Sequence, residues 1–334
     1  MQCCNNWWFN ITKGGFYSLA NESRLQQTKG SYKVAGIVSG LLNKSAYSEG
    51  IGKNGKPWRS IRFFVSTSPV NQIPIELFGS EQDFVYPYSS KDKKSQKMPF
   101  HMRSQVPQGY HIIGVNATIP AGTKTVSNVD YDAVEYIYQN LSEGDRVWVN
   151  GETEFRKFEN KQGNIVNSVR HTIKSIGIAD KEIDFNAPDF KERAEFEQEI
   201  VVLDSIVERD LNKVIVNAYT IGYGDKLNEA QFAINLDTHK EFGNNFVKKC
   251  TYGTWIKVYG KIISAVELGD PEPVVDEWGG EIPDSYNRPI KNTIRELRIV
   301  GAADYEPKRY TEEDFAPETA FDENPFGDEY SPGF

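Results

Sequence analysis

The chain has 334 residues, with 38 Lys and Arg against 47 Asp and Glu, a net charge of −9 and 39% apolar residues. This length is enough for two cores of ~100 to 200 residues each, and the mean hydropathy of −0.55 is typical of a soluble protein. No apolar run approaches the ~20 residues that a membrane span needs, and the opening MQCCNNWWFN lacks the order of a secretory signal, so we expect a cytoplasmic protein.

The first 30 residues form an N-terminal arm that precedes the first predicted strand. Three consecutive rings, Trp7, Trp8 and Phe9, make this arm too apolar to stay free in water. We expect the rings to pack on the folded chain or on a neighbouring copy of it.

Residues 31–180 are predicted to form a first β domain. Apolar residues that alternate with polar ones predict strands over 32–38, 59–65, 73–78, 144–151 and 167–177. A basic insertion over 85–128 follows the third strand and contains six Lys or Arg against one acidic residue. A helix is predicted over 131–141, because apolar residues recur there with the spacing of one helical face.

Residues 181–303 repeat this order and are predicted to form a second β domain. Strands are predicted over 200–203, 214–219, 231–236, 253–260 and 292–301, with a short helix over 241–249. Gly253 and Gly260 bracket one strand as Gly144 and Gly151 do in the first copy. We interpret the repeat as a duplication of one domain.

The charge is distributed unevenly along the chain. Residues 1–30 carry +2 and residues 31–180 carry +4, whereas 181–303 carry −7 and 304–334 carry −8. The stretch 311–334 has eight acidic side chains, no Lys or Arg and three prolines, so we expect residues 304–334 to form a disordered acidic tail. The first domain can therefore attract a polyanion despite the negative total.

Three strands, a helix and two further strands are the element order of an OB-fold, a small Greek-key barrel. On this order and the two Gly-x6-Gly strands, residues 31–304 resemble tandem OB-fold single-stranded DNA-binding proteins of bacterial and phage replication. The resemblance implies a mainly β protein of two five-stranded barrels that coats and protects single-stranded DNA during replication, recombination and repair. OB-folds also bind oligosaccharides and proteins, so the fold does not settle the function.

Single strands are held by cations that follow the phosphates and by rings on which bases stack. Alternation in the second strand places Ile61, Phe63 and Val65 on the more apolar face, so we expect the opposite face to bind the ligand. Trp148 alternates with two valines and should point outward, unless the insertion covers it. The candidate nucleic-acid-binding residues are Lys53, Lys56, Trp58, Arg59, Arg62, Phe64, Tyr86, Tyr88, Lys91, Lys93, Lys94, Lys97, Phe100, Arg103, Trp148, Phe155, Arg156, Lys157, Phe158 and Arg170.

The segment from Asp322 to Phe326 resembles the acidic tip of bacterial single-stranded DNA-binding proteins. The resemblance implies docking into basic pockets of replication and recombination enzymes, although Pro325 and Phe326 lie eight residues before the end of this sequence. The candidate partner-binding residues are Asp322, Glu323, Pro325, Phe326 and Phe334. A merely solubilising tail is the alternative.

We expect neither catalysis nor a cofactor. The four histidines and three cysteines are dispersed without metal-ligand spacing, and neither a phosphate-binding P-loop nor a Gly-x-Ser-x-Gly motif is present. Two rival functions remain open at this point. One is a β-rich structural or adaptor protein that uses its rings for protein contacts, and the other is a preference for RNA.

Overall fold

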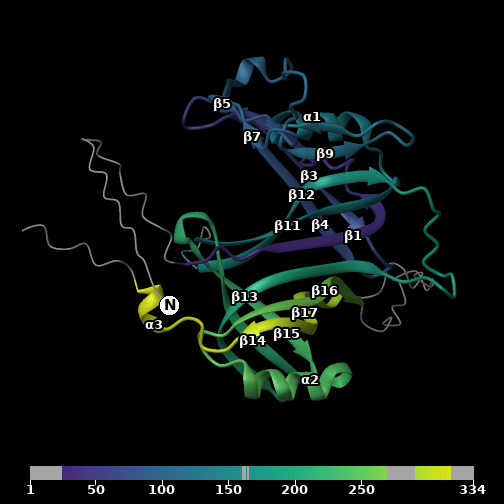
Figure 1. The fold of residues 1–334 in the computed structure, drawn as a ribbon. Helices are drawn as coiled ribbons and strands as arrows, with labels where there is room; N and C mark the ends of the chain where they lie inside the picture. Colours follow the sequence, from purple (N-terminus) through teal and green to yellow (C-terminus); the bar gives the residue numbers. More distant parts are fainter. Residues whose placement is uncertain (1–24, 160–162, 164, 269–289, 317–334) are drawn as a thin grey trace, which may run out of the picture.

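The structure is a computed structural model that describes residues 25–159, 163, 165–268 and 290–316. The described chain is mainly β, with α1 (Asp130–Asn140) and α2 (Leu236–Lys249) at opposite ends of the molecule (Figure 1). The candidate tail residues Asp322, Glu323, Pro325, Phe326 and Phe334, and the rings of the N-terminal arm, lie outside the described residues.

The first barrel closes through five strands. Strands β1 (Gly30–Ser39), β3 (Pro57–Ser66) and β4 (Gln72–Ser80) pair antiparallel in succession. β12 (Ile165–Ile178) then pairs parallel with β4 and antiparallel with β11 (Arg146–Glu159), which pairs back to β1. A short strand, β2 (Tyr47–Ile51), extends β3 at its start, and α1 lies between β4 and β11 in sequence.

The second barrel repeats these pairings in the same order. β13 (Arg193–Glu208), β14 (Lys213–Ile221) and β15 (Leu227–Asn235) are antiparallel, and β15 pairs parallel with β17 (Ile290–Glu306). β16 (Trp255–Leu268) pairs with both β17 and β13 and closes the ring. The two halves of the described chain therefore share one strand order.

The repeated glycines close the two barrels at equivalent points. A Cβ atom on Gly151 would lie 1.7 Å from the carbonyl oxygen of Thr172, and one on Gly260 would lie 2.3 Å from the ring of Phe196. Only glycine leaves room for the neighbouring backbone and core ring at these positions. Side chains from both barrels form one continuous buried cluster, in which Phe155 of β11 packs on Phe232 of β15 with ring centroids 5.7 Å apart.

The two barrels share a seam. The first half of β1 pairs antiparallel with the start of β13, from Gly30 opposite Gln198 to Ala35 opposite Arg193. The strands β11, β1, β13 and β16 therefore form one hydrogen-bonded surface that crosses from one barrel to the other (Figure 1). The Asn71 amide adds a second link, because its Nδ2 donates to the carbonyl of Ile262 at 3.0 Å.

The basic insertion is folded and contains short strands of its own. Its first part is a hairpin, residues 84–99, in which β5 (Phe84–Val85) pairs with β8 (Met98–Pro99) and β6 (Tyr88–Ser89) pairs with β7 (Lys94–Ser95). The short 3-10 helix η1 (Phe100–Met102) follows, and later β9 (Val115–Thr118) pairs with β12 and with β10 (Val126–Asn128). Buried Val85, Met98 and Phe100 give the insertion a small core of its own.

The sequence predicts a disordered tail from residue 304, but the chain is still folded at α3 (Glu312–Phe315). β17 continues to Glu306, Tyr310 is buried, and its backbone N–H donates to the carbonyl of Gly253 at 3.0 Å. The one-turn helix α3 (Glu312–Phe315) follows with a capping box, and Phe315 packs on Tyr219 with centroids 5.3 Å apart. Residues 304–316 therefore belong to the folded second barrel, because their rings find an apolar surface there.

Both predicted helices are present, and α2 begins five residues earlier than predicted. The predicted helix over 131–141 corresponds to α1, and the one over 241–249 corresponds to the end of α2. Asn235 explains the earlier start, because its side-chain oxygen accepts the backbone N–H of Asp237 at 2.7 Å. Such a cap satisfies one of the unpaired donors of a first helical turn. The remaining 3-10 helix, η2 (Tyr223–Asp225), lies in the turn before β15.

A buried histidine makes the first barrel sensitive to acid. His171 lies in the core with its ring 5.1 Å from that of Tyr32, and burial lowers its pKa to about 4. In an unfolded chain the imidazole would bind a proton near its ordinary pKa of 6.5. The unfolded state therefore binds more protons between these two pH values, so the free energy of unfolding falls as the pH drops through this range.

We expect His171 alone to cost about 2 to 3 kcal/mol of stability between pH 7 and pH 4.5, because one unit of pKa is worth ~1.36 kcal/mol. Urea unfolding of the wild type and of His171→Phe at both pH values measures this cost. The variant should lose less stability on acidification, whereas His111→Gln, at an exposed site, should behave like the wild type. Equal losses in all three proteins would contradict the assignment.

Candidate nucleic-acid interface

The two faces of β3 are arranged as the sequence predicts. Ile61, Phe63 and Val65 are buried in the core of the first barrel. On the opposite face Arg62 is exposed, and Trp58 and Phe64 are half-buried, so neither ring is sealed inside. This outer face continues onto β4 and from there to the basic insertion.

A stacked pair of rings occupies the edge of this outer face. Trp58 of β3 and Phe78 of β4 have centroids 5.9 Å apart and planes inclined by 26°. The indole lies against Gly50 of β2, where a Cβ atom would come within 3.0 Å of it. The Phe78 side chain is 56% exposed. The candidate residues omit Phe78, although its alternation with buried Leu77 is a signal that could have identified it.

Phe78 also lines a hollow of about 540 Å³ between β4 and the insertion. Phe84 and Tyr86 line the same hollow and are 40% and 55% exposed. The Lys97 ammonium lies over the ring of Phe84, 3.8 Å from its centroid. The half-buried ring of Trp58 and the exposed rings of Phe78, Phe84 and Tyr86 are together called the aromatic row.

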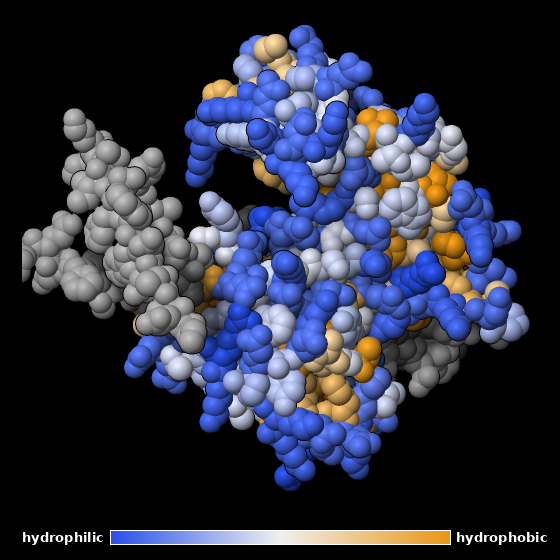
Figure 2. Space-filling view, in the orientation of Figure 1, coloured by the Kyte–Doolittle hydropathy of each residue, from blue (hydrophilic) through white to orange (hydrophobic). Residues whose placement is uncertain are grey.

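Exposed lysines surround the aromatic row. Lys91, Lys93, Lys94 and Lys97 are exposed on the hairpin 84–99, which is called the basic hairpin below, and Lys53 is exposed at the turn between β2 and β3. The acid of the hairpin, Asp92, accepts a hydrogen bond from the Ser89 hydroxyl at 2.9 Å. Figure 2 shows hydrophilic side chains over this upper part of the molecule, with the surface hollowed beneath it. Rings and cations therefore occur together on one surface.

Two further candidates near this surface make protein contacts. Lys56 forms an ion pair with Asp83 at 2.9 Å. Tyr88 is half-buried and packs edge-on against His111, and the backbones of the two residues are hydrogen-bonded. Both residues thus help to attach the insertion.

Three further candidate binding residues, Phe100, Arg103 and Arg59, are buried or paired within the protein. Phe100 is buried, and the Arg103 guanidinium lies over its ring at 4.3 Å while forming two hydrogen bonds to Asp132, at 2.5 and 2.9 Å. Arg59 forms an ion pair with Glu135 at 2.8 Å. Arg103 thus fixes the insertion against α1, and Arg59 joins β3 to the same helix. A buried ring and guanidinium groups that are already paired are poorly placed to bind bases or phosphate.

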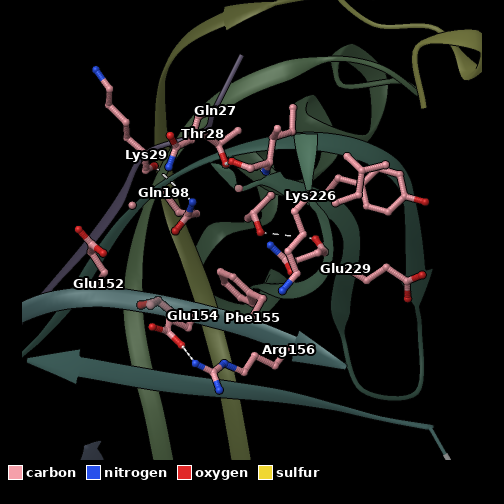
Figure 3. A pocket seen from close by; sticks show the side chains of 18 of the residues that line it. Gln27, Thr28, Lys29, Glu152, Glu154, Phe155, Arg156, Gln198, Lys226 and Glu229 are labelled. Atoms are coloured by element: carbon pink, nitrogen blue, oxygen red, sulfur yellow. Dashed lines mark hydrogen bonds and ion pairs between the residues drawn. The ribbon is translucent and has the colours of Figure 1, made fainter. Parts of the chain in front are cut away.

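The candidates on β11 and β12 are also occupied by protein contacts. Phe155 is buried and points towards a hollow of about 810 Å³ between the barrels (Figure 3). Beside it Arg156 pairs with Glu154 at 2.5 Å, and Lys157 reaches Glu229 of the second barrel at 2.5 Å. Arg170 forms an ion pair with Glu76 at 3.1 Å, and the side chain of Phe158 lies outside the described residues. The burial of Phe155 corrects its assignment as a stacking platform.

Trp148 lies on a different surface, the seam between the barrels. It is half-buried and points outward, while Val147 and Val149 are buried. The residues that line its hollow come from β1, β11, β13, β16 and the segment before β13, and none comes from the insertion. Burial of Trp148 under the insertion is therefore wrong.

In the second barrel, the ring of Trp255 on β16 is covered by other residues of that barrel. Arg309 lies over Trp255 at 5.4 Å from the ring centroid, and Phe315 contacts Tyr219 and Tyr252 beside it. These contacts come from the segment that follows β17. Trp255 is therefore covered by contacts within the second barrel itself.

In the described ranges, no three His, Cys, Asp or Glu side chains are close enough together to hold a metal ion. No helix within these ranges has the length and apolar character needed to cross a bilayer. Cys250 is a buried free thiol, and burial raises its pKa to about 11.

Several solved structures have a partly similar chain path. The wild-type single-stranded DNA binding protein from Thermus aquaticus is 7% identical with a TM-score of 0.39, over 83% of this chain and 93% of that chain. A deletion mutant of that protein is 8% identical with the same TM-score, over 83% and 94%. The small single-stranded DNA-binding protein from Streptomyces coelicolor is 13% identical with a TM-score of 0.19, over 45% and 93%.

No curated protein matches the sequence. A family described as YorF matches residues 44–324, from the turn between β1 and β2 to the segment beyond the second barrel. Because this match spans most of the chain, the protein belongs to the YorF family.

Proposed function

We propose that the protein binds single-stranded DNA with little sequence preference, on the aromatic row and the basic hairpin of the first barrel. The observation that carries the proposal is the position of Lys97 over the exposed ring of Phe84, in a hollow that Phe78 and Tyr86 also line. Every base has a face that can stack on a ring, and every nucleotide carries a phosphate for a lysine. This combination suits an unpaired strand of any sequence.

The strand order supports this location. We assign both barrels to the OB-fold, because each closes through three antiparallel strands, a parallel pairing of the third with the last, and a helix before the fourth. OB-folds bind oligonucleotides on the face of their second and third strands. In the first barrel these strands are β3 and β4, which carry Trp58 and Phe78.

The wider role follows from the same assignment. In this proposal the protein is a non-enzymatic cytoplasmic coat for single-stranded DNA in replication, recombination and repair, and it needs no cofactor. The net charge of −8 over residues 304–334 supports recruitment of basic partners through the end of the chain. Partner enzymes would then approach an acidic segment while the first barrel holds the strand.

The test is a titration of the full-length chain with oligothymidine, duplex DNA and oligouridine, read by tryptophan fluorescence. Oligothymidine should quench the fluorescence, and its affinity should fall with salt, with a slope of about −3.5 if five lysines contact phosphates. Duplex DNA should bind more weakly, because paired bases cannot stack on the aromatic row. Absence of binding at 50 mM salt, or binding insensitive to salt, would favour a protein-contact role instead. Tighter binding of oligouridine would change the ligand to RNA.

A further inference from the structure

The seam between the barrels carries a second surface with a ring and cations. Across the strands, Trp148 of β11 lies opposite Ala35 of β1, which lies opposite Arg193 of β13. The next outward row contains Lys33 of β1 and Lys261 of β16. This surface forms a hollow of about 820 Å³ and is called the seam trough. Its lining includes Trp148, Ala35 and Asn150, the cations Lys33, Lys191, Arg193 and Lys261, and the acids Glu192 and Glu195.

The indole of Trp148 is held flat by a glycine. A Cβ atom on Gly177 would lie 2.5 Å from the indole ring, so the ring lies directly on the backbone of β12. On its other side the neighbouring residue is Ala35, whose side chain is too small to cover a ring. A broad ring supported from below and flanked by a small residue is a suitable platform for a base.

The cations of the trough are freer to bind a ligand than its acids, which already have partners within the protein. Lys33, Lys191 and Arg193 are exposed, and the structure places no ion pair on them among the residues it describes. Glu195 forms an ion pair with Lys261 at 2.7 Å, and Glu192 accepts hydrogen bonds from Thr67 and Asn71 in the turn between β3 and β4. The surface therefore offers positive charge beside a ring, which is complementary to a phosphate backbone with unpaired bases.

The trough continues onto the second barrel. A smaller hollow of about 210 Å³ adjoins it and shares Lys33, Glu195 and Lys261 with it. This smaller hollow is also lined by Tyr259, which is 37% exposed and has the Lys257 ammonium 5.7 Å from its ring centroid. A ring therefore stands near each end of a path that crosses from the first barrel to the second.

We propose that the seam trough is a second contact surface for single-stranded nucleic acid, occupied by the strand after it leaves the aromatic row. This inference rests on the proposed function and adds the route of the strand to it. The aromatic row lies on β3 and β4, whereas the trough lies on β11, β1, β13 and β16. A short oligonucleotide fills only the first surface, and a long one reaches both.

The test uses labelled oligothymidines of about 10 and about 40 nucleotides, because one OB-fold covers ~4–16 nucleotides. Binding to the full-length chain is followed by fluorescence anisotropy at 50 and 200 mM salt. The variant Lys33→Glu/Arg193→Glu reverses two trough cations, and Lys240→Glu/Lys248→Glu reverses two exposed cations of α2 as a control with the same net charge. The trough variant should bind the long oligomer about tenfold more weakly, with a salt slope shallower by about 1.4.

The short oligomer should bind both variants alike. The variant Trp148→Phe keeps a ring on Gly177 and should lose that part of the tryptophan quenching which only the long oligomer produces. If the two charge-reversed variants bind the long oligomer equally, the trough is not a contact surface, although the first site stands. If the wild type binds neither oligomer, the proposed function fails and the trough fails with it.

Discussion

Replacing Trp58 and Phe78 together by alanine should lower the affinity for oligothymidine by about 10- to 100-fold. The two rings stack on each other at the edge of the hollow, so their removal takes away one continuous platform. Stacking of a base on a ring is worth ~1–3 kcal/mol, which corresponds to this range of affinities. Anisotropy of a labelled oligomer measures the loss without depending on the fluorescence of Trp58.

Two further variants make the result specific to the aromatic row. Tyr223→Ala/Tyr305→Ala removes two exposed rings of the second barrel and should leave the affinity unchanged. Trp58→Phe/Phe78→Tyr keeps both rings and should restore most of the binding. Thermal unfolding of each protein separates lost binding from lost fold. If Trp58→Ala/Phe78→Ala binds oligothymidine as tightly as Tyr223→Ala/Tyr305→Ala does, the aromatic row is not part of the interface.

The outer face of β3 could be predicted because alternation alone determines it. Ile61, Phe63 and Val65 form a continuous apolar set, and the opposite face must then be open. The same reasoning applies to Phe78, which alternates with the buried residues of β4. It also applies to the start of β13, where alternation begins at Arg193 although the predicted strand begins at residue 200. Alternation therefore also identifies the open face of β4 and the earlier start of β13.

Other contacts depend on tertiary structure that no local pattern contains. Phe100 follows a lysine-rich segment and resembles an exposed ring, but folding of the insertion packs it against Val85 and Met98. Arg103 finds its partner Asp132 twenty-nine residues along the chain, at the start of α1. A sequence pattern identifies a cation, whereas only the fold shows whether a carboxylate already neutralises it.

The seam illustrates the same limit between domains. The sequence predicts two copies of one barrel and contains no signal for how the copies meet. Pairing of β1 with β13 places Lys33 beside Glu195 and brings Arg193 into line with Trp148. The trough therefore arises from residues of separate copies, and the local motifs along either copy alone give Lys33 and Arg193 no role.

Neutralising the basic hairpin should weaken binding mainly at low salt. The variant with Lys91, Lys93, Lys94 and Lys97 all changed to Gln removes up to four phosphate contacts, which should make the salt slope shallower by about 2.8. The ratio of wild-type to variant affinity should then shrink by about 50-fold between 50 and 200 mM salt, as that slope requires. The hairpin should stay folded, because its two strand pairs and the Ser89 contact with Asp92 do not involve these ammonium groups.

A control with the same net charge separates position from total charge. Changing Lys240, Lys248, Lys249 and Lys308 to Gln makes the chain equally more acidic, but these exposed lysines lie on and beside the second barrel. This control should keep the wild-type salt slope. The whole chain already carries −9, so a response to net charge alone would weaken binding by both variants equally. Equal salt slopes for the two variants would therefore contradict the role of the basic hairpin. A difference between them would instead show that a polyanion responds to the local field of the first barrel, which is the physical basis of the proposed function.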